Sequence, residues 1–112
     1  MELRVKNPWF QEIKMGRKII EGRAGTLEKF AKVVGCQIVF SCGDETLSVR
    51  AVRVKHYKTV REYLESEGWQ KAAPHLGSLE QALSAYSEIY SESVISQRGG
   101  IVAIELGCFV DP

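Results

Sequence analysis

The chain has 112 residues, of which 45% are hydrophobic and 26% charged, a composition typical of one folded domain rather than of a disordered segment. Its formal net charge of +1 neither indicates nor excludes a nucleic-acid partner, because the distribution of charge decides that question. The three cysteines form no CxxC pair and no cluster with histidine, which argues against a disulfide framework and a structural zinc site. We expect no metal and no cofactor.

The N-terminal third is expected to alternate short strands with a short helix. Residues 1–6 alternate apolar and charged side chains, which predicts a half-buried strand. Asn7 suits the cap of a helix that carries an apolar stripe and continues to Gly16. Residues 17–23 follow as a strand that holds an unusual amount of charge. Residues 26–34 are ambiguous, with a helical turn as one interpretation.

The middle of the chain predicts a pair of strands with a bend. Residues 36–42 and 45–57 are joined by a Gly-Asp turn. In the second strand the apolar side chains fall on odd numbers up to Ala51 and on even numbers from Val52. Such a shift sends the remaining apolar residues to the wrong face unless the strand bulges or bends. Small closed barrels use such bends at their corners, so the pattern predicts a curled sheet.

The second half is expected to begin with two helices and to end in a strand. A capping box at Thr59 predicts a helix to about Ser66, and a second box at Ser78 predicts a helix to about Ser91. The apolar residues 100–106 predict a final strand at the centre of the sheet. The order of elements predicts an α+β fold, a mixed sheet with helices grouped toward one end.

The charged segment before residue 24 contains a spaced pattern, GxKxxExR, formed by Gly16, Lys18, Glu21 and Arg23. This pattern resembles the signature of the ASCH domain family, and the order of elements around it resembles that family over nearly the whole chain. The resemblance implies a small PUA-like β-barrel of mixed strands with about three helices packed around it. It also implies a single domain over residues 1–112.

The resemblance implies an RNA- or nucleotide-binding domain whose ligand cleft is lined by this motif. The expected ligand-binding residues come from the motif and from a basic strand: Gly16, Lys18, Glu21, Arg23, Arg53, Lys55 and Tyr57. Cations beside an aromatic side chain are typical of phosphate neutralisation combined with base stacking. The structural alternative is that Glu21 and Arg23 pair at the rim of the barrel while Lys18 and the basic strand are solvated.

An enzymatic alternative follows from bacterial members of the family that hydrolyse N4-acetylcytidine with a Lys, a Thr three residues on and a distant Glu. These positions correspond to Lys18, Glu21 and Glu67, so the lysine is kept and the hydroxyl is replaced by a carboxylate. A lysine whose pKa is lowered by burial and by Arg23 can act as a base or nucleophile, with Glu67 as proton carrier. These three residues are the candidate catalytic set.

A third alternative is a protein-interaction module, because related domains occur in transcription coactivators. The partner we expect first is RNA or a nucleoside-containing ligand. The chain contains no signal peptide and no apolar run of about 18 residues, so we expect an intracellular domain that does not use a membrane. The sequence leaves open the base preference and the oligomeric state.

Overall fold

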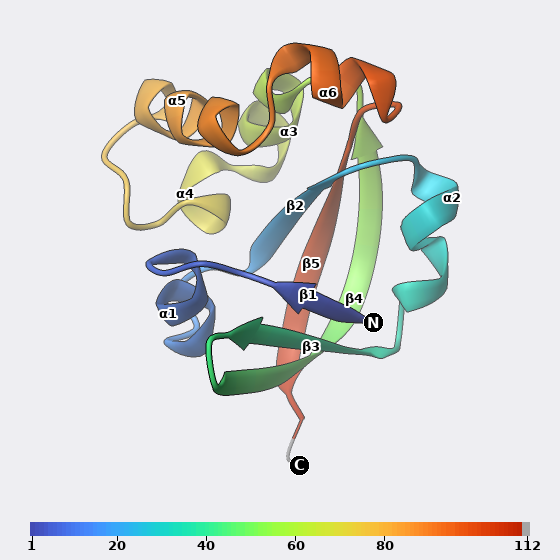
Figure 1. Ribbon diagram of the computed structural model, residues 1–112, viewed down its shortest axis with the longest axis vertical. Helices are drawn as coiled ribbons and strands as arrows, with labels where there is room; N and C mark the ends of the chain where they lie inside the picture. Colours follow the sequence, from blue (N-terminus) through green and yellow to red (C-terminus); the bar gives the residue numbers. More distant parts are fainter. Residues whose placement is uncertain (111–112) are drawn as a thin grey trace.

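The computed structural model describes residues 1–110, which form a curled five-stranded sheet with helices around it (Figure 1). The strands are β1 (Glu2–Arg4), β2 (Ile20–Ala24), β3 (Gln37–Cys42), β4 (Glu45–Tyr57) and β5 (Ile101–Phe109). Their order across the sheet is β1-β3-β4-β5-β2, with β1 parallel to β3 and every other pair antiparallel. The expected α+β fold is confirmed, and β5 lies inside the sheet as predicted.

The helices are more numerous than the three or so that we expected. They are α1 (Trp9–Lys14), α2 (Leu27–Phe30), α3 (Val60–Glu67), α4 (Trp69–Ala72), α5 (Leu79–Ile89) and α6 (Glu92–Gln97), with a 3-10 turn at Ala31–Val33. Helices α2, α4 and α6 are too short to show a 3.6-residue period. The caps predicted at Thr59 and Ser78 form, since each side chain accepts from a main-chain N–H three residues on. The cap predicted at Asn7 was wrong, because α1 begins after Pro8 and has no side-chain cap. No helix in residues 1–110 has both the length and the apolar character to span a membrane.

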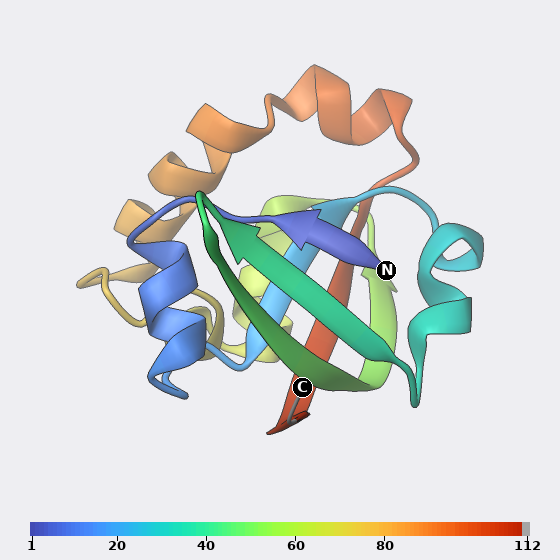
Figure 2. The same cartoon turned by 60° about the horizontal axis from the view of Figure 1, so that its bottom comes forward.

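Strand β4 bends where its apolar pattern changes phase, which turns β3 and β1 across the molecule (Figure 2). Its pairing with β5 changes register between Val49 and Ala51 and again between Ala51 and Arg53. Val49 and Ala51 are buried inside the curl and Val54 resumes packing on that side, whereas Val52 is 49% exposed. The predicted bulge is therefore confirmed, although Val52 does not point inward.

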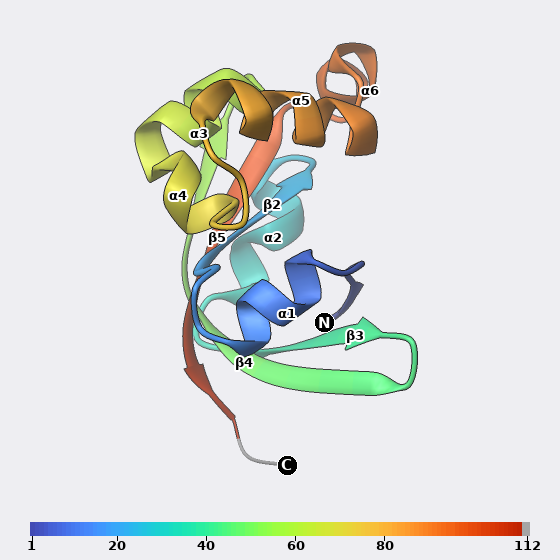
Figure 3. The same ribbon diagram turned by 90° about the vertical axis from the view of Figure 1, so that its left-hand side faces the viewer.

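Strand β5 separates two hydrophobic clusters. Val102 and Ile104 face the cluster inside the curled sheet, while Ile101 and Ala103 face the cluster beneath the later helices. Because both faces of β5 are buried over residues 101–104, this part of its sequence is continuously apolar, whereas residues 107–109 are exposed. Helices α3 to α6 gather at one end of the sheet, as Figure 3 shows from the side.

The curled sheet remains open between its two edge strands, β1 and β2. Within residues 1–110 no main-chain hydrogen bond joins these edges. A side chain spans the gap instead, because Arg23 Nη2 donates to the main-chain oxygen of Arg4 at 2.8 Å. The sheet is therefore a half-barrel whose seam is closed by an arginine.

Candidate ligand cleft at the seam of the half-barrel

A cleft of about 340 Å³ lies along this seam, between β1, β2 and the C-terminal half of α5. Its lining residues are Arg4, Val5, Lys6, Trp9, Glu21, Gly22, Arg23, Tyr86, Glu88, Ile89 and Tyr90. The set combines three cations, two carboxylates and three aromatic rings. Small-molecule sites have volumes of about 300–1,000 Å³, so this cleft has the size of a compact site.

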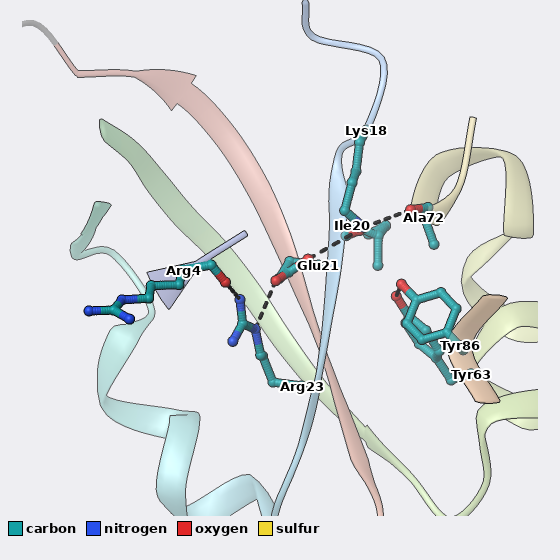
Figure 4. A network of polar contacts seen from close by, with 8 residues as sticks. All are labelled: Arg4, Lys18, Ile20, Glu21, Arg23, Tyr63, Ala72 and Tyr86. Carbon is teal, nitrogen blue, oxygen red and sulfur yellow. Dashed lines mark hydrogen bonds and ion pairs between the residues drawn. The ribbon is translucent and has the colours of Figure 1, made fainter. Parts of the chain in front are cut away.

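Glu21 is the buried carboxylate of the cleft (Figure 4). Its Oε2 accepts a hydrogen bond from Arg23 Nε at 2.8 Å, and its Oε1 lies 3.4 Å from Lys18 Nζ. The pairing of Glu21 with Arg23, expected from their spacing on one face of a strand, is confirmed. Glu21 is only 6% exposed, so the two cations balance a charge that is largely removed from water.

Lys18 lies behind the cleft and is absent from its lining. Its side chain is fully buried, and its ammonium donates to the main-chain oxygens of Ile20 and Ala72 at 2.6 Å each. The third neighbour of the ammonium is the carboxylate of Glu21, with which it forms an ion pair at 3.4 Å. Burial lowers the pKa of Lys18, and the charge of Glu21 opposes that shift. The alternative of a solvated Lys18 was therefore wrong.

A tyrosine pair forms the wall beside Glu21. Tyr86 lines the cleft, and its hydroxyl shares one hydrogen bond of 2.7 Å with the hydroxyl of Tyr63. Burial is the main cause that raises the pKa of both phenols above the ordinary value. Gly22 permits this packing, because a Cβ on that residue would lie 2.6 Å from the Tyr63 oxygen.

The basic strand contributes a second and separate network on β4. Arg53 donates to both carboxylate oxygens of Glu67 at 3.1 and 2.6 Å, and to Glu105 at 3.0 Å. Tyr57 also donates to Glu67, and Lys55 lies over the Tyr57 ring. The pKa of Tyr57 is raised to about 12, mainly by burial and secondly by the hydrogen bond to Glu67. The charge of Arg53 is therefore already balanced by protein carboxylates.

Burial acts to raise the pKa of Glu67, but the hydrogen bonds from Arg53 and Tyr57 more than offset it and hold that pKa below its ordinary value. Lys18 and Glu67, which the hydrolase hypothesis combines, form no ion pair with each other within residues 1–110. They belong to two different networks of contacts.

The structure thus brings Lys18, Glu21 and Arg23 into one cluster. Gly16 is not among the lining residues and instead ends α1 in a left-handed turn, with φ of +77°. Sequence reasoning missed two cationic lining residues, Arg4 and Lys6. Their alternation with apolar residues placed them on one side of a strand, but only the curl of the sheet brings that strand beside β2.

These features define a small α+β half-barrel with a charged cleft at its seam. The family model described as the ASCH domain matches residues 3–107, and the chain belongs to this family. It resembles the crystal structure of the hypothetical protein PH0355, with 29% identity, 97% of each chain covered and a TM-score of 0.83. It also resembles the solution structure of protein PF0455 from Pyrococcus furiosus, with 30% identity, 99% of this chain and 97% of that chain covered, and a TM-score of 0.72. No curated protein matches the chain.

Proposed function

We propose that this ASCH domain binds RNA or a nucleotide, with a base of the ligand in the cleft at the seam. The observation that carries the proposal is the convergence of a buried carboxylate, several cations and three aromatic rings on one cavity. A carboxylate accepts hydrogen bonds from base amino groups, and aromatic rings stack on bases. Lysine and arginine neutralise the phosphates that accompany the base.

The arrangement of Glu21 supports recognition of a neutral base beside an anionic backbone. Lys18 and Arg23 hold the carboxylate in one position, so little ordering remains to be done when a ligand binds. The two cations also offset the repulsion that an isolated carboxylate would exert on a phosphate. Lys6 lines the same cleft, is exposed and forms no ion pair within residues 1–110, which supports a contact between this lysine and a phosphate of the ligand.

The basic strand has a more distant role in this proposal. Lys55 is exposed and adds to the attraction that draws an anionic ligand toward the domain. Arg53 remains bound to Glu67 and Glu105, and Tyr57 remains bound to Glu67. Direct contact with phosphate is assigned to the cleft instead.

The test is fluorescence anisotropy of a labelled single-stranded RNA at two salt concentrations. Tyr90→Leu removes a ring from the cleft and is expected to weaken binding by roughly 5- to 150-fold, because base stacking contributes about 1–3 kcal/mol. Lys6→Ala is expected to lower the salt dependence of log K by about 0.7, as for one lost phosphate contact. Lys14→Ala is the matched control, since Lys14 is exposed, pairs with Glu45 and does not line the cleft.

Absence of binding at low salt both to RNA and to free nucleotides would refute the proposal and favour a protein partner. Binding that is unchanged in both Tyr90→Leu and Lys6→Ala would also refute the assignment of the ligand to this cleft. The expected order of affinity is wild type and Lys14→Ala together, followed by Lys6→Ala and then Tyr90→Leu.

A further inference from the structure

We infer that the cleft selects guanine among the RNA bases through the two carboxylate oxygens of Glu21, an inference that rests on the proposed function. Two features of the cleft match the edge of guanine: Glu21 retains acceptor capacity, and donors lie beside it.

Glu21 is a buried carboxylate that the protein only partly satisfies. An ionised carboxylate offers about four lone-pair positions, two on each oxygen. In the described residues the one hydrogen bond to it comes from Arg23, and Lys18 lies at the longer distance of 3.4 Å. Buried polar groups are normally hydrogen-bonded, and a buried charge is costly unless it is paired and hydrogen-bonded. The remaining acceptor positions of this cleft-lining residue are therefore a site for donors from a ligand.

Guanine has the base edge that suits such a pair of acceptors. Its Watson–Crick edge carries two neighbouring donors, N1–H and the 2-amino group, which match the two oxygens of one carboxylate. Adenine and cytosine each place a single amino donor beside a ring nitrogen that is an acceptor. Uracil places a single N–H between two carbonyl oxygens. Against a carboxylate, these extra acceptors meet lone pairs and repel, so only guanine makes two charge-assisted hydrogen bonds.

Donors beside the carboxylate complete the match with guanine, whose third Watson–Crick group is the acceptor O6. Arg23 uses Nε for Glu21 and Nη2 for Arg4, and its Nη1 donates to no other residue of the described chain. The pair of Tyr86 and Tyr63 shares one hydrogen bond between two hydroxyls, so one of the two O–H groups has no acceptor within residues 1–110. The cleft thus presents two acceptors with donors close by.

The test uses a matched pair of ligands, so that it does not depend on any variant folding correctly. A labelled oligouridine strand carries a single central guanosine or, in the second strand, a single central inosine. Inosine keeps N1–H and O6 but lacks the 2-amino group. Loss of one hydrogen bond to a charged group is expected to weaken binding by about 10-fold or more. Strands with central adenosine or cytidine are expected to bind no better than the inosine strand.

Glu21→Gln supplies the second arm of the experiment. The amide keeps the size of the side chain but replaces one acceptor oxygen by a donor. The variant is expected to bind the guanosine and inosine strands with affinities within about 2-fold of each other. Competition with free GMP, AMP and UMP distinguishes the source of the base, since GMP that competes as well as RNA indicates a nucleotide ligand. GMP that competes weakly, but better than AMP and UMP, indicates guanine within RNA.

The outcomes separate this inference from the proposal on which it rests. Equal affinity of the wild-type protein for the guanosine and inosine strands overturns guanine selection, while the binding itself leaves the proposed function standing. A preference for guanosine that persists in Glu21→Gln overturns the assignment to that carboxylate. Absence of binding to any of the strands and to GMP overturns both.

Discussion

Replacement of Lys18 by methionine is the perturbation that bears most directly on the architecture of the cleft. Methionine keeps an unbranched apolar chain but removes the ammonium. The change leaves the main-chain oxygens of Ile20 and Ala72 without their donor and deprives Glu21 of one of its two cations. Removal of one partner from a buried ion pair costs about 3–5 kcal/mol. Because Arg23 still pairs with Glu21, we expect a loss near the lower limit, about 3 kcal/mol.

A loss of about 3 kcal/mol is large beside the 5–15 kcal/mol by which domains are normally stable. Urea denaturation followed by circular dichroism is the assay. With a slope of about 1.5 kcal/mol per molar urea, the midpoint should fall by about 2 M. In the double variant Lys18→Met, Glu21→Gln, the carboxylate whose Oε1 has lost Lys18 is also replaced by a neutral amide, so part of the loss should be recovered, with a coupling of about 1 kcal/mol or more. A loss below about 1 kcal/mol in Lys18→Met would refute the account of Lys18 as a buried structural cation.

Three further predictions concern stability. Gly22→Ala is expected to cost about 1–3 kcal/mol in thermal or urea denaturation, because the new Cβ would lie 2.6 Å from the Tyr63 oxygen; an unchanged midpoint would contradict this packing. Glu67 has a lowered pKa in the folded state, so its stabilisation is present above about pH 4.3 and is lost as the pH falls through the folded pKa. Arg53→Ala should reduce that acid dependence, and an identical pH profile would argue against the pair. The pKa of Lys18 is lowered by burial, so at this group the unfolded state binds more protons, and Lys18 adds to the wild-type unfolding free energy a rise with pH that ends at about pH 10.4. Lys18→Met should lack this rise, and a rise of equal size in the variant would contradict the assignment.

Local features of the fold could be predicted from the sequence because their causes are local. The phase change after Ala51 predicted the bend in β4, and the caps at Thr59 and Ser78 predicted the starts of α3 and α5. The pairing of Glu21 with Arg23 followed from two positions on one face of a strand. In each case the interacting groups lie within a few residues of one another.

The remaining features depend on contacts between distant parts of the chain. Lys18 is buried because α4 supplies the oxygen of Ala72, 54 residues away. Arg53 is paired because the end of α3 brings Glu67 beside β4. Lys6 lines the cleft because the curled sheet places β1 opposite β2. Periodicity and caps carry no information on such long-range neighbours, so the exposed or buried state of each charge could not be read from the sequence.

The family pattern located the right segment but not the role of each residue in it. The motif indicated a cleft around Lys18, Glu21 and Arg23, and all three lie at the seam. Within that cluster only Glu21 and Arg23 line the cavity, whereas Lys18 is buried and contacts the carboxylate of Glu21 from the interior. The difference matters for mutagenesis, because a change at Lys18 tests stability first and ligand binding second.

The most direct test of the central claim is an NMR titration of the ¹⁵N-labelled protein with a single-stranded RNA that contains guanosine. The chain has two tryptophans, and each gives one indole N–H signal. Trp9 lines the cleft and Trp69, in α4, does not, so one spectrum contains both the probe and its control. We predict that the Trp9 indole signal and the amide signals of residues 21–23 shift together as RNA is added, while the Trp69 indole signal stays in place. Shifts confined to residues 53–57 of the basic strand, with Trp9 unchanged at saturation, would contradict the account.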